Sequence, residues 1–425
     1  MHMRLFFFCS ATVLFLGIAP GLSAQPDCAA HRPIVFVHGF LASGDTWSNF
    51  VQGFRAAGYC PERLFVFDWN TLDGTIDHKT NLDAAIDALL ARTGADRVDL
   101  VGHSAGGGMS YLYLIDSAHA AKVARFVQIG SMNQHQPAGP NGGTPTMNLW
   151  SDQDRIMGGK DMPGTTNVML SGFDHYKVAT SRASFEAVFR FLNDAPPPAE
   201  QPKSPASVRI GGRAVFFGQN RPASGSGVEL YYLNSQNGAR IGTAMSVKAD
   251  EQGFWAIPDV RPGVPVELVV RATETARPVH YFREGFARSS ELVYLRALPD
   301  RSSTVGIMLA GLPTSPKQSV VNVFSTSQAV VFGRDTLSVD DVPLSTETLA
   351  PSEKSVISFF LYDGNSNNKS ELLPIGIFGR FPFLAGLDVF INPKKRKPMQ
   401  VFFNGRRQVV RKIPASEGIQ VVVFD

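Results

Sequence analysis

The residues best suited to chemistry lie in the segment Gly102-His103-Ser104-Ala105-Gly106. An apolar run at 97–101 precedes this segment and a helical pattern at 109–117 follows it, so Ser104 is predicted at a strand-to-helix turn. A serine on such a turn takes a strained backbone conformation, and its hydroxyl points out of the sheet. The tight turn leaves little room for a Cβ at the outer positions, which favours glycine there. The pattern is weak alone in a chain with 39 glycines, so other residues must support Ser104 as a nucleophile.

A serine nucleophile needs a base, and the base needs an orienting acid. Two carboxylates, Asp152 and Asp154, follow a predicted strand at 146–150. The carboxyl end of a strand is where ligands meet an open α/β sheet. We favour Asp154 as the acid, because the apolar pair Ile156-Met157 indicates that the chain turns back beneath it. Asp152 remains the competitor, and a solvated loop or a helix cap is the alternative for either residue.

His175 is the candidate base. It follows a predicted strand at 167–170 and a glycine, and it precedes a predicted helix at 181–192. The same strand–loop–helix position is not matched by the remaining histidines considered, which are His31, His78, His119, His135 and His280. His103 is expected to pack structurally beside the nucleophile, and Asp174 is too close to His175 in sequence to act as its acid.

Backbone amides are predicted to stabilise the oxyanion that forms when Ser104 attacks a carbonyl group. One donor is the N–H of Ala105, the residue after the nucleophile. The second is the N–H of Phe40, because Gly39 lets the chain turn directly after a predicted strand at 34–37. His38 is expected to brace this loop and to take no part in the chemistry.

Residues 32–193 resemble the small bacterial serine lipases and esterases of the α/β-hydrolase fold. The resemblance rests on Val37-His38-Gly39-Phe40 and on the segment around Ser104, and it extends to 151–154 and 174–176. It implies hydrolysis of acyl esters, including triacylglycerols, through an acyl-enzyme on Ser104, without a cofactor. It also implies that Asp154 fixes the tautomer of His175. Short-chain esterases, amidases and perhydrolases share this triad, and a non-catalytic binding module is a further alternative.

The elements that must position these residues alternate along residues 25–194. Apolar strands are predicted at 34–37, 64–67, 98–101, 124–129, 146–150 and 167–170, with amphipathic helices such as 47–57, 81–93 and 181–192 between them. This alternation predicts a mostly parallel sheet with helices on both faces. The expected fold class is therefore an α/β hydrolase followed by an all-β region.

A proline-rich linker at 195–204 ends this module. Short strands separated by Gly, Pro, Asn and Ser then predict an all-β, sandwich-like or barrel-like region in two parts, 205–300 and 301–425. The predicted strands are 208–217, 228–232, 254–257, 264–270 and 292–298 in the first part, and 320–324, 355–361, 387–391, 400–403 and 420–424 in the second. Residues 249–263 resemble transthyretin-like sandwich domains. The whole arrangement is similar to an archaeal long-chain lipase with a C-terminal β-rich, lipid-binding domain. The Phe-rich segment 376–387 either forms an apolar patch for acyl chains or a lipid–water interface, or fills the β cores.

The N-terminus has the pattern of a secretory signal peptide over residues 1–24, with Arg4, an apolar run and then small residues. An uncleaved anchor is the alternative, but Pro20-Gly21 breaks the apolar run and no other stretch is long enough to cross a bilayer. We therefore expect a secreted or periplasmic protein. Cys28 and Cys60 each precede a strand that is predicted to lie in the parallel sheet, which favours a disulfide over two free thiols.

The overall charge of +3 gives no indication of a nucleic-acid partner. The basic run 394–397 is interpreted as a solvated loop. Residues 363–371 place oxygen ligands at alternating positions, as a calcium loop does, but they lack the required glycine and the final glutamate. A hairpin turn is the preferred interpretation, and we expect neither a metal nor a nucleotide cofactor.

Overall fold

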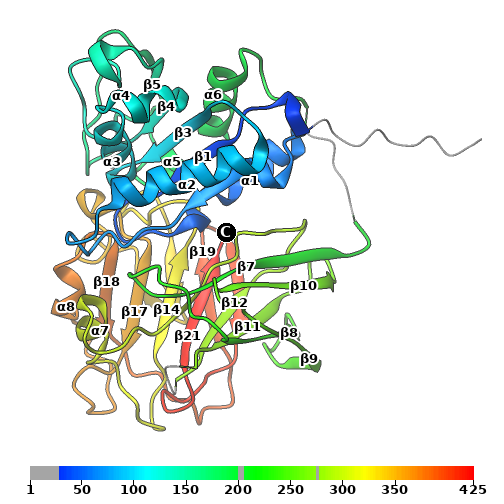
Figure 1. The fold of residues 1–425 in the computed structure, drawn as a ribbon. Helices are drawn as coiled ribbons and strands as arrows, with labels where there is room; N and C mark the ends of the chain where they lie inside the picture. Colours follow the sequence, from blue (N-terminus) through cyan, green and yellow to red (C-terminus); the bar gives the residue numbers. More distant parts are fainter. Residues whose placement is uncertain (1–27, 200–204, 274–276) are drawn as a thin grey trace, which may run out of the picture.

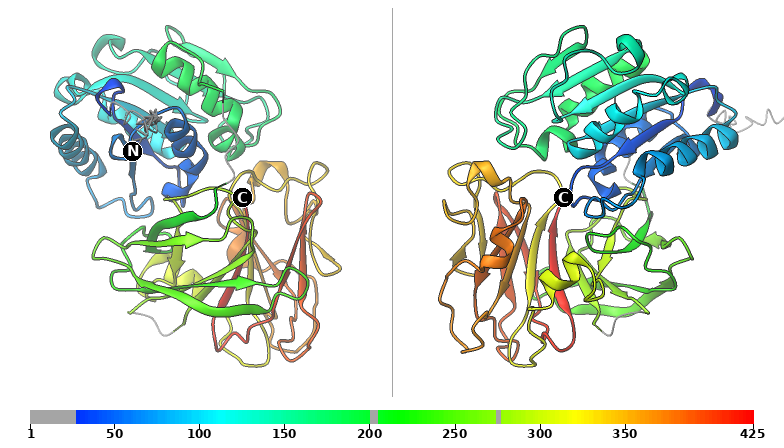
Figure 2. Two further views of the ribbon diagram at one scale, coloured as in Figure 1. Left: turned by 90° about the vertical axis from the view of Figure 1, so that its right-hand side faces the viewer. Right: turned by 60° about the vertical axis from the view of Figure 1, so that its left-hand side comes forward.

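The computed structural model describes residues 28–199, 205–273 and 277–425. These form an N-terminal module (28–199) and a strand-rich β region (205–425), drawn above and below one another in Figure 1. Both views of Figure 2 show the module against one end of the β region. The predicted signal peptide and residues 200–204 of the predicted linker lie outside the described residues.

The N-terminal module is built on a parallel sheet of six strands in the order β2-β1-β3-β4-β5-β6. The strands are β1 (Ile34–Val37), β2 (Leu64–Phe67), β3 (Val98–His103), β4 (Val123–Ile129), β5 (Thr146–Trp150) and β6 (Thr166–Met169). Every neighbouring pair is parallel. This pairing confirms the predicted parallel sheet. Runs of Val, Ile and Leu between helical segments are typical of a sheet that is buried on both faces.

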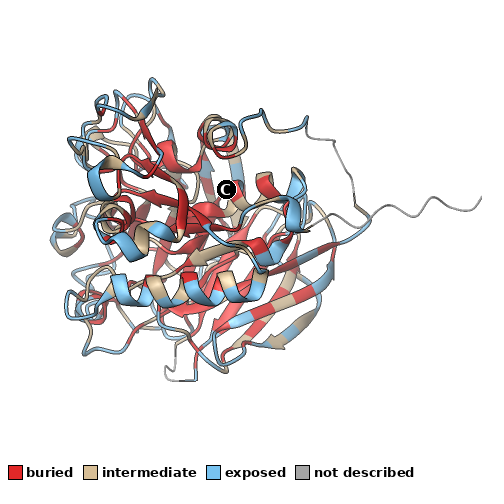
Figure 3. Ribbon diagram, turned by 45° about the horizontal axis from the view of Figure 1, so that its top comes forward, coloured by how far each residue is buried: buried red, intermediate tan, exposed pale blue. Residues whose placement is uncertain are grey.

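Helices cover both faces of this sheet, as Figure 3 indicates by the exposed outward sides of the helices over buried strands. On one face, α1 (Ser48–Ala56) and α6 (Arg182–Asn193) pack with Ile34 and Phe36 of β1. On the other, α2 (His78–Thr93) and α3 (Ala105–Tyr113) pack with Val35 and Val37. The alternation along β1 follows from the two-residue period of a strand.

Helix α2 begins three residues before the predicted helix, because the sequence supplies a cap at Asp77. Its carboxylate accepts hydrogen bonds from the Lys79 and Thr80 amides. Gly94 ends the helix in a left-handed conformation with φ 64°, which glycine adopts without steric cost.

The β region contains an eight-stranded sheet in the order β18-β17-β14-β21-β12-β11-β8-β9. Its strands are β8 (Gly227–Leu233), β9 (Arg240–Lys248), β11 (Val266–Arg271), β12 (Val279–Arg283), β14 (Val321–Ser325), β17 (Ser358–Tyr362), β18 (Leu384–Asp388) and β21 (Ile419–Phe424). Smaller sheets are formed by β10 (Phe254–Val260), β7 (Val208–Phe216) and β13 (Leu295–Ala297), and by β16 (Val342–Pro343), β15 (Leu337–Val339), β19 (Met399–Phe403) and β20 (Arg406–Val410).

The large sheet is shared by the two parts predicted at 205–300 and 301–425. The C-terminal strand β21 pairs in parallel with β12 on one side and with β14 on the other. Val421 and Val423 face one apolar cluster, whereas Val422 and Phe424 face the other. The boundary predicted at residue 300 therefore does not separate two sheets. The transthyretin-like assignment of 205–300 stays a prediction.

Several elements of the β region differ from the sequence-based expectation. Strands β9 and β12 were not predicted, and neither were the short helices α7 (Thr304–Leu309) and α8 (Gly376–Gly379). A strand expected at 387–391 is found as β18, three residues earlier, because residues 384–388 pair with β17. Strand β9 is mostly exposed or half-buried, so it lacks the apolar run that a buried strand shows.

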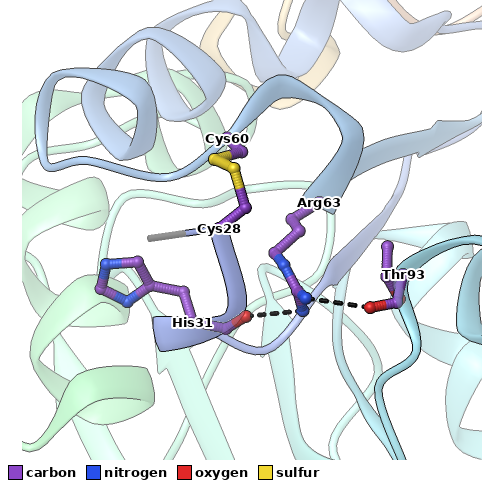
Figure 4. The surroundings of a disulfide bond; sticks show 5 residues. All are labelled: Cys28, His31, Cys60, Arg63 and Thr93. Carbon is purple, nitrogen blue, oxygen red and sulfur yellow. Dashed lines mark hydrogen bonds between the residues drawn. A yellow bond between two sulfur atoms is a disulfide. The ribbon is translucent and has the colours of Figure 1, made fainter. Parts of the chain in front are cut away.

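The predicted disulfide between Cys28 and Cys60 is present, with the two Cα atoms 5.4 Å apart (Figure 4). Beside it, the guanidinium of Arg63 donates hydrogen bonds to the carbonyl oxygens of His31 and Thr93, at 2.9 and 3.0 Å. The bridge and these two bonds fasten the start of the module to the chain around β2 and to the end of α2. No helix in the described part of the chain is long and apolar enough to span a membrane.

Candidate active site

Ser104 lies between the end of β3 and the start of α3. Its backbone has φ 51° and ψ −123°, a conformation that residues with a side chain rarely adopt. The glycines around it are required by close contacts. A Cβ on Gly102 would lie 2.7 Å from the Cα of Gly107, and one on Gly106 would lie 2.4 Å from the carbonyl oxygens of Val37 and His38. The turn thus has the strained geometry expected of a nucleophile between a strand and a helix.

The structure brings Ser104, His175 and Asp154 into one hydrogen-bonded row. Ser104 Oγ lies 2.9 Å from His175 Nε2, and His175 Nδ1 lies 2.8 Å from Asp154 Oδ2. All three side chains are buried. Because an ionised carboxylate can only accept, Nδ1 carries the proton and Nε2 is left to accept from the serine. This is the arrangement in which a serine can lose its proton to an imidazole.

Of the two competing aspartates, only Asp154 reaches the histidine. Burial raises the pKa of Asp154, but the hydrogen bonds from His175 and from the Met157 and Ile156 amides lower it by more. The net pKa is therefore below the usual value. Asp154 is therefore a carboxylate at neutral pH. Asp152 is exposed, and it accepts hydrogen bonds from the Gly172 amide and the Ser171 hydroxyl, so it holds the loop after β6.

The loop after β1 carries the predicted oxyanion donor Phe40 past the nucleophile. A Cβ on Gly39 would lie 3.1 Å from Ser104 Cβ, so the glycine lets this loop approach closely. Ala105 is the first residue of α3, and its N–H has no partner inside the helix. Within the described residues, the Phe40 amide likewise has no hydrogen-bond partner. Both amides are thus available to an oxyanion.

His38 braces this loop as a neutral imidazole. Burial lowers its pKa, although the nearby Asp68 opposes the shift. The Trp69 amide donates to His38 Nε2 at 3.2 Å, which leaves the proton on Nδ1, 2.9 Å from the Gly39 carbonyl oxygen. That hydrogen bond fixes the peptide between Gly39 and Phe40, the one that bears the predicted oxyanion donor.

His103 has a structural contact that sequence reasoning did not identify. Its Nε2 lies 2.9 Å from the carbonyl oxygen of His175, so it helps to fix the backbone of the candidate base. Burial is the main cause that lowers the pKa of His103 to about 3, and the ring is neutral at physiological pH. A histidine next to the nucleophile carries no sequence signal for this contact, since the partner is a backbone atom 72 residues away.

A cavity opens at Ser104 between the N-terminal module and the β region. Its empty volume, which includes the part open to solvent, is about 1040 Å³. The module contributes the rim near Ser104, His175 and Phe40. The β region contributes most of the apolar wall, including Phe217, Leu298, Leu309, Phe324, Leu384 and Val421. Sequence reasoning missed these residues, because they come from separate strands and loops and share no motif.

The phenylalanines of the segment 376–387 lie in two different environments. Phe378 is fully buried in the β region, where it stacks on Phe360 with ring centroids 4.4 Å apart. Phe383 instead lies at the cavity and stacks on the ring of His175 with the centroids 5.8 Å apart and an angle of 12°. One aromatic residue of the segment thus fills a core and another covers the candidate base.

Three aspartates of the module have side chains that are only 3–5% exposed, and each is bound by the β region. Asp45 pairs with Arg296 at 2.6 Å, and Asp68 accepts a hydrogen bond from the Tyr294 hydroxyl at 2.6 Å. Asp174, next to His175, pairs with Arg334 at 2.9 Å. Asp68 also pairs with Arg213, so all three aspartates have a basic partner in the β region, and breaking such a buried pair is costly.

The residues offer no built metal site in the described part of the chain. Among the described residues, the one group of three potential metal ligands close enough to share an ion is Cys28, Cys60 and Glu62, and both cysteines are in the disulfide. In the loop 363–371, Asp363 accepts hydrogen bonds from the Asn367 and Asn368 amides. These bonds close the loop on itself. The predicted hairpin turn is wrong, because the next strand, β18, pairs with β17 in parallel.

Comparison with protein families gives three matches along the chain. A model described as the α/β-hydrolase fold matches residues 32–207, and a model of the lipase C-terminal domain matches residues 206–299. A third model, described as a C-terminal domain, matches residues 324–417.

Several solved structures are similar to about two fifths of the chain. A lipase of Bacillus licheniformis in its mature form is 19% identical over 40% of this chain and 94% of its own, with a TM-score of 0.33. A carboxylesterase of the thaumarchaeon Nitrososphaera gargenis is 14% identical over 39% and 90%, with a TM-score of 0.31. A probable hydrolytic enzyme of Pseudomonas aeruginosa PAO1 is 18% identical over 40% and 88%, with a TM-score of 0.32. With these family matches and the fold, the N-terminal module is an α/β hydrolase, and residues 206–299 match a lipase C-terminal domain.

Proposed function

We propose that the protein is a secreted or periplasmic lipase, a serine carboxylester hydrolase that cleaves acyl esters through an acyl-enzyme. The observation that carries the proposal is the hydrogen-bonded row of Ser104, His175 and Asp154 at the mouth of an apolar cavity. The predicted signal peptide and the disulfide support export, since disulfides persist in oxidising compartments. N-terminal sequencing of the mature protein tests cleavage after Ala24.

The reaction proceeds in two steps. Ser104 Oγ attacks the ester carbonyl carbon while its proton passes to His175 Nε2, and Asp154 stabilises the imidazolium that forms. The amides of Phe40 and Ala105 hold the oxyanion. The tetrahedral intermediate then releases the alcohol, which leaves with the proton from His175. Water, with its proton taken by His175, cleaves the acyl-enzyme and restores the serine.

The acyl chain of the substrate binds in the cavity between the module and the β region. Its wall is apolar on the β side, and burying a methylene group from water contributes about 0.8 kcal/mol. Binding in this cavity would explain why a β region accompanies the hydrolase module. The β region would then contact the acyl chain directly, in addition to any contact with a lipid surface.

The first experiment measures hydrolysis rate against acyl chain length, from acetate to palmitate esters, with Ser104→Ala as the inactive control. We expect a maximum at medium or long chains and a loss of about 10³-fold or more in the control. A maximum at acetate would favour a short-chain esterase. Hydrolysis of amides in preference to esters would favour an amidase, and activity of Ser104→Ala equal to that of the wild type would exclude the mechanism.

A matched pair of variants on α7 tests the cavity itself. Leu309 lines the cavity, whereas Ile307 on the same helix is 65% exposed. Leu309→Trp is expected to reduce the rate on long chains by about 10- to 200-fold, as for one methylene group that the pocket no longer accommodates, and to spare acetate. Ile307→Trp is expected to leave the whole profile unchanged. Equal profiles in the two variants would place the acyl chain elsewhere.

A further inference from the structure

Asn220 is a residue of the β region that reaches into the N-terminal module. It lies in the loop between β7 and β8 and is only 7% exposed. Its backbone has φ 55°, a left-handed conformation in which asparagine is enriched. The backbone N–H of Asn220 donates to the carbonyl oxygen of Phe216 at 3.1 Å. The turn at the end of β7 therefore presents this side chain in one direction.

The side chain of Asn220 hydrogen-bonds with the loop that carries Phe40. Its Nδ2 donates to the carbonyl oxygens of Ala42 at 2.8 Å and of Trp69 at 3.0 Å. Its Oδ1 accepts from the Ser43 hydroxyl. Nδ2 also lies 3.2 Å from His38 Nε2. Both amide hydrogens have an acceptor, and all of the partners belong to the N-terminal module.

These partners surround the predicted oxyanion donor along the chain. His38 precedes Phe40 by two residues and Ala42 follows it by two. The loop between them has no regular secondary structure, and Leu41 has a positive φ of 58°. Such a loop is held by individual hydrogen bonds, since it has no strand or helix partner. A donor that moves by about 1 Å from its place can cost about 10²-fold in rate.

We propose that Asn220 is a positioning residue for the oxyanion loop, so that the β region fixes the Phe40 amide that a reaction at Ser104 requires. This inference rests on the proposed function, because it assigns a task to a residue of the same site. It differs from acyl-chain binding in that Asn220 acts through the loop and touches no substrate. The N-terminal module by itself would then have a complete triad and an imprecise oxyanion hole.

The test compares Asn220→Gly with Asn368→Gly in the full chain. Asn368 also has a left-handed backbone, with φ 62°, but it is exposed in the 363–371 loop of the β region. Glycine tolerates both backbones, so each variant removes only a side chain. Rates are expressed per active serine, titrated with a fluorophosphonate, and the affinity for an alkyl boronic acid, which forms a tetrahedral adduct on the serine, is measured in parallel.

We expect Asn220→Gly to lower kcat about 10- to 100-fold with KM within about twofold, and to weaken boronate binding in proportion. Asn368→Gly should match the wild type. Asn220→Asp keeps the size of the side chain and its acceptor but loses both donor hydrogens, and it should show the same loss of kcat. It replaces Asn220→Gly in the test if that variant fails to fold. A kcat per titrated serine equal to that of Asn368→Gly, in an active enzyme, would overturn the inference alone. Absence of titration in the wild type would overturn the proposed function, and the inference with it.

Discussion

The two walls of the candidate active site are built in different ways. On the side of the N-terminal module, Ser104, its glycines and Ala105 lie within a few residues of one another on one turn. On the facing side, the β region supplies residues from separate strands, loops and a short helix, among them Leu309, Phe383 and Val421. The first wall follows from local backbone geometry. The second exists only when a shared β-sheet has formed.

This difference separates chemistry from substrate fit. The strained turn at Ser104 demands glycine and a small set of residue types, so it leaves a motif in the sequence. An apolar wall demands only volume and apolarity, which many residues provide from any place in the chain. The module therefore determines which reaction is feasible, and the β region sets the shape of the cavity in which it would occur.

The largest expected effect concerns the wall that the sequence describes. Asp154→Asn keeps the size of the side chain but removes the charge that fixes His175, and we expect kcat to fall about 10³- to 10⁴-fold. Asp152→Asn is the matched control, because Asp152 lies two residues away and faces the Ser171 hydroxyl and the Gly172 amide. It should retain activity within about threefold. Steady-state rates on one ester decide between them, and a larger loss in Asp152→Asn would reverse the assignment.

The fold of the module could be predicted because each signal is local. Strands β1, β2 and β5 begin and end at the predicted residues, and α2 differs only in the turn added by Asp77. The order of Ser104, Asp154 and His175 was expected from the α/β-hydrolase plan, and each of these residues follows a predicted strand. Each of these inferences needs no knowledge of which strand pairs with which.

The β region resisted prediction for the opposite reason. The parallel pairing of β12 with β21 joins residues about 140 positions apart, and nothing in either strand specifies the other. Strand β9 lies at the edge of its sheet, where Ser246 and Lys248 are exposed and Met245 and Val247 are only partly buried, so no buried apolar run marks it. Phe383 could be placed only after β18 was paired with β17, since its position over His175 is a tertiary contact.

Removal of the disulfide tests how much this covalent link contributes to the stability of the N-terminal module. Cys28 and Cys60 are 32 positions apart, and closing a loop of this size is expected to contribute about 3–4 kcal/mol to the free energy of unfolding. We expect the double variant Cys28→Ser, Cys60→Ser to lose that free energy of unfolding, and so to unfold at a lower temperature and at a lower urea concentration. Its kcat at 20 °C should stay within about twofold, because neither cysteine lines the cavity. The reduced wild type should reproduce the variant, and unchanged unfolding in both would contradict the prediction.

In the β region, a buried carboxylate is expected to contribute to stability as the disulfide does in the N-terminal module. Glu267 on β11 is fully buried and receives hydrogen bonds from Arg240, His280 and Arg411. Burial raises its pKa, but these three partners together hold the net pKa well below the usual range. The folded state therefore keeps the carboxylate ionised at pH values where the unfolded chain takes up a proton. The contribution of Glu267 to the free energy of unfolding is complete above about pH 4.5 and is lost progressively as the pH falls below this value.

The variant Glu267→Gln should lower the free energy of unfolding at pH 7 by about 2–3 kcal/mol, less than for a wholly dry site because Arg240 and Arg411 are partly exposed. Since glutamine does not titrate, the difference from the wild type should narrow between pH 4.5 and pH 3. Glu229→Gln on the neighbouring strand β8 should change stability by less than about 0.5 kcal/mol. Urea unfolding at three pH values measures all three proteins. A difference that stays constant with pH would mean that Glu267 is not ionised in the folded state.

The smallest effect separates two ion pairs that both join the module to the β region. Arg55 pairs with Glu291 at 2.9 Å where both side chains are more than a third exposed, and such pairs contribute about 0.5 kcal/mol or less. Arg334 pairs with Asp174, whose side chain is 4% exposed, beside His175. Removing Arg334 leaves that carboxylate with only backbone amides from Tyr176, Lys177 and Ala329.

We therefore expect Arg334→Ala to lower the free energy of unfolding by about 1–2 kcal/mol and kcat several-fold, with partial recovery of both in Arg334→Lys. Arg55→Ala should change neither quantity measurably. Thermal unfolding and steady-state kinetics of the three variants give the comparison directly. If Arg55→Ala and Arg334→Ala proved equal, contact between the two parts would depend on area alone. The greater cost at Arg334 would instead show that the β region stabilises the loop that bears the candidate base.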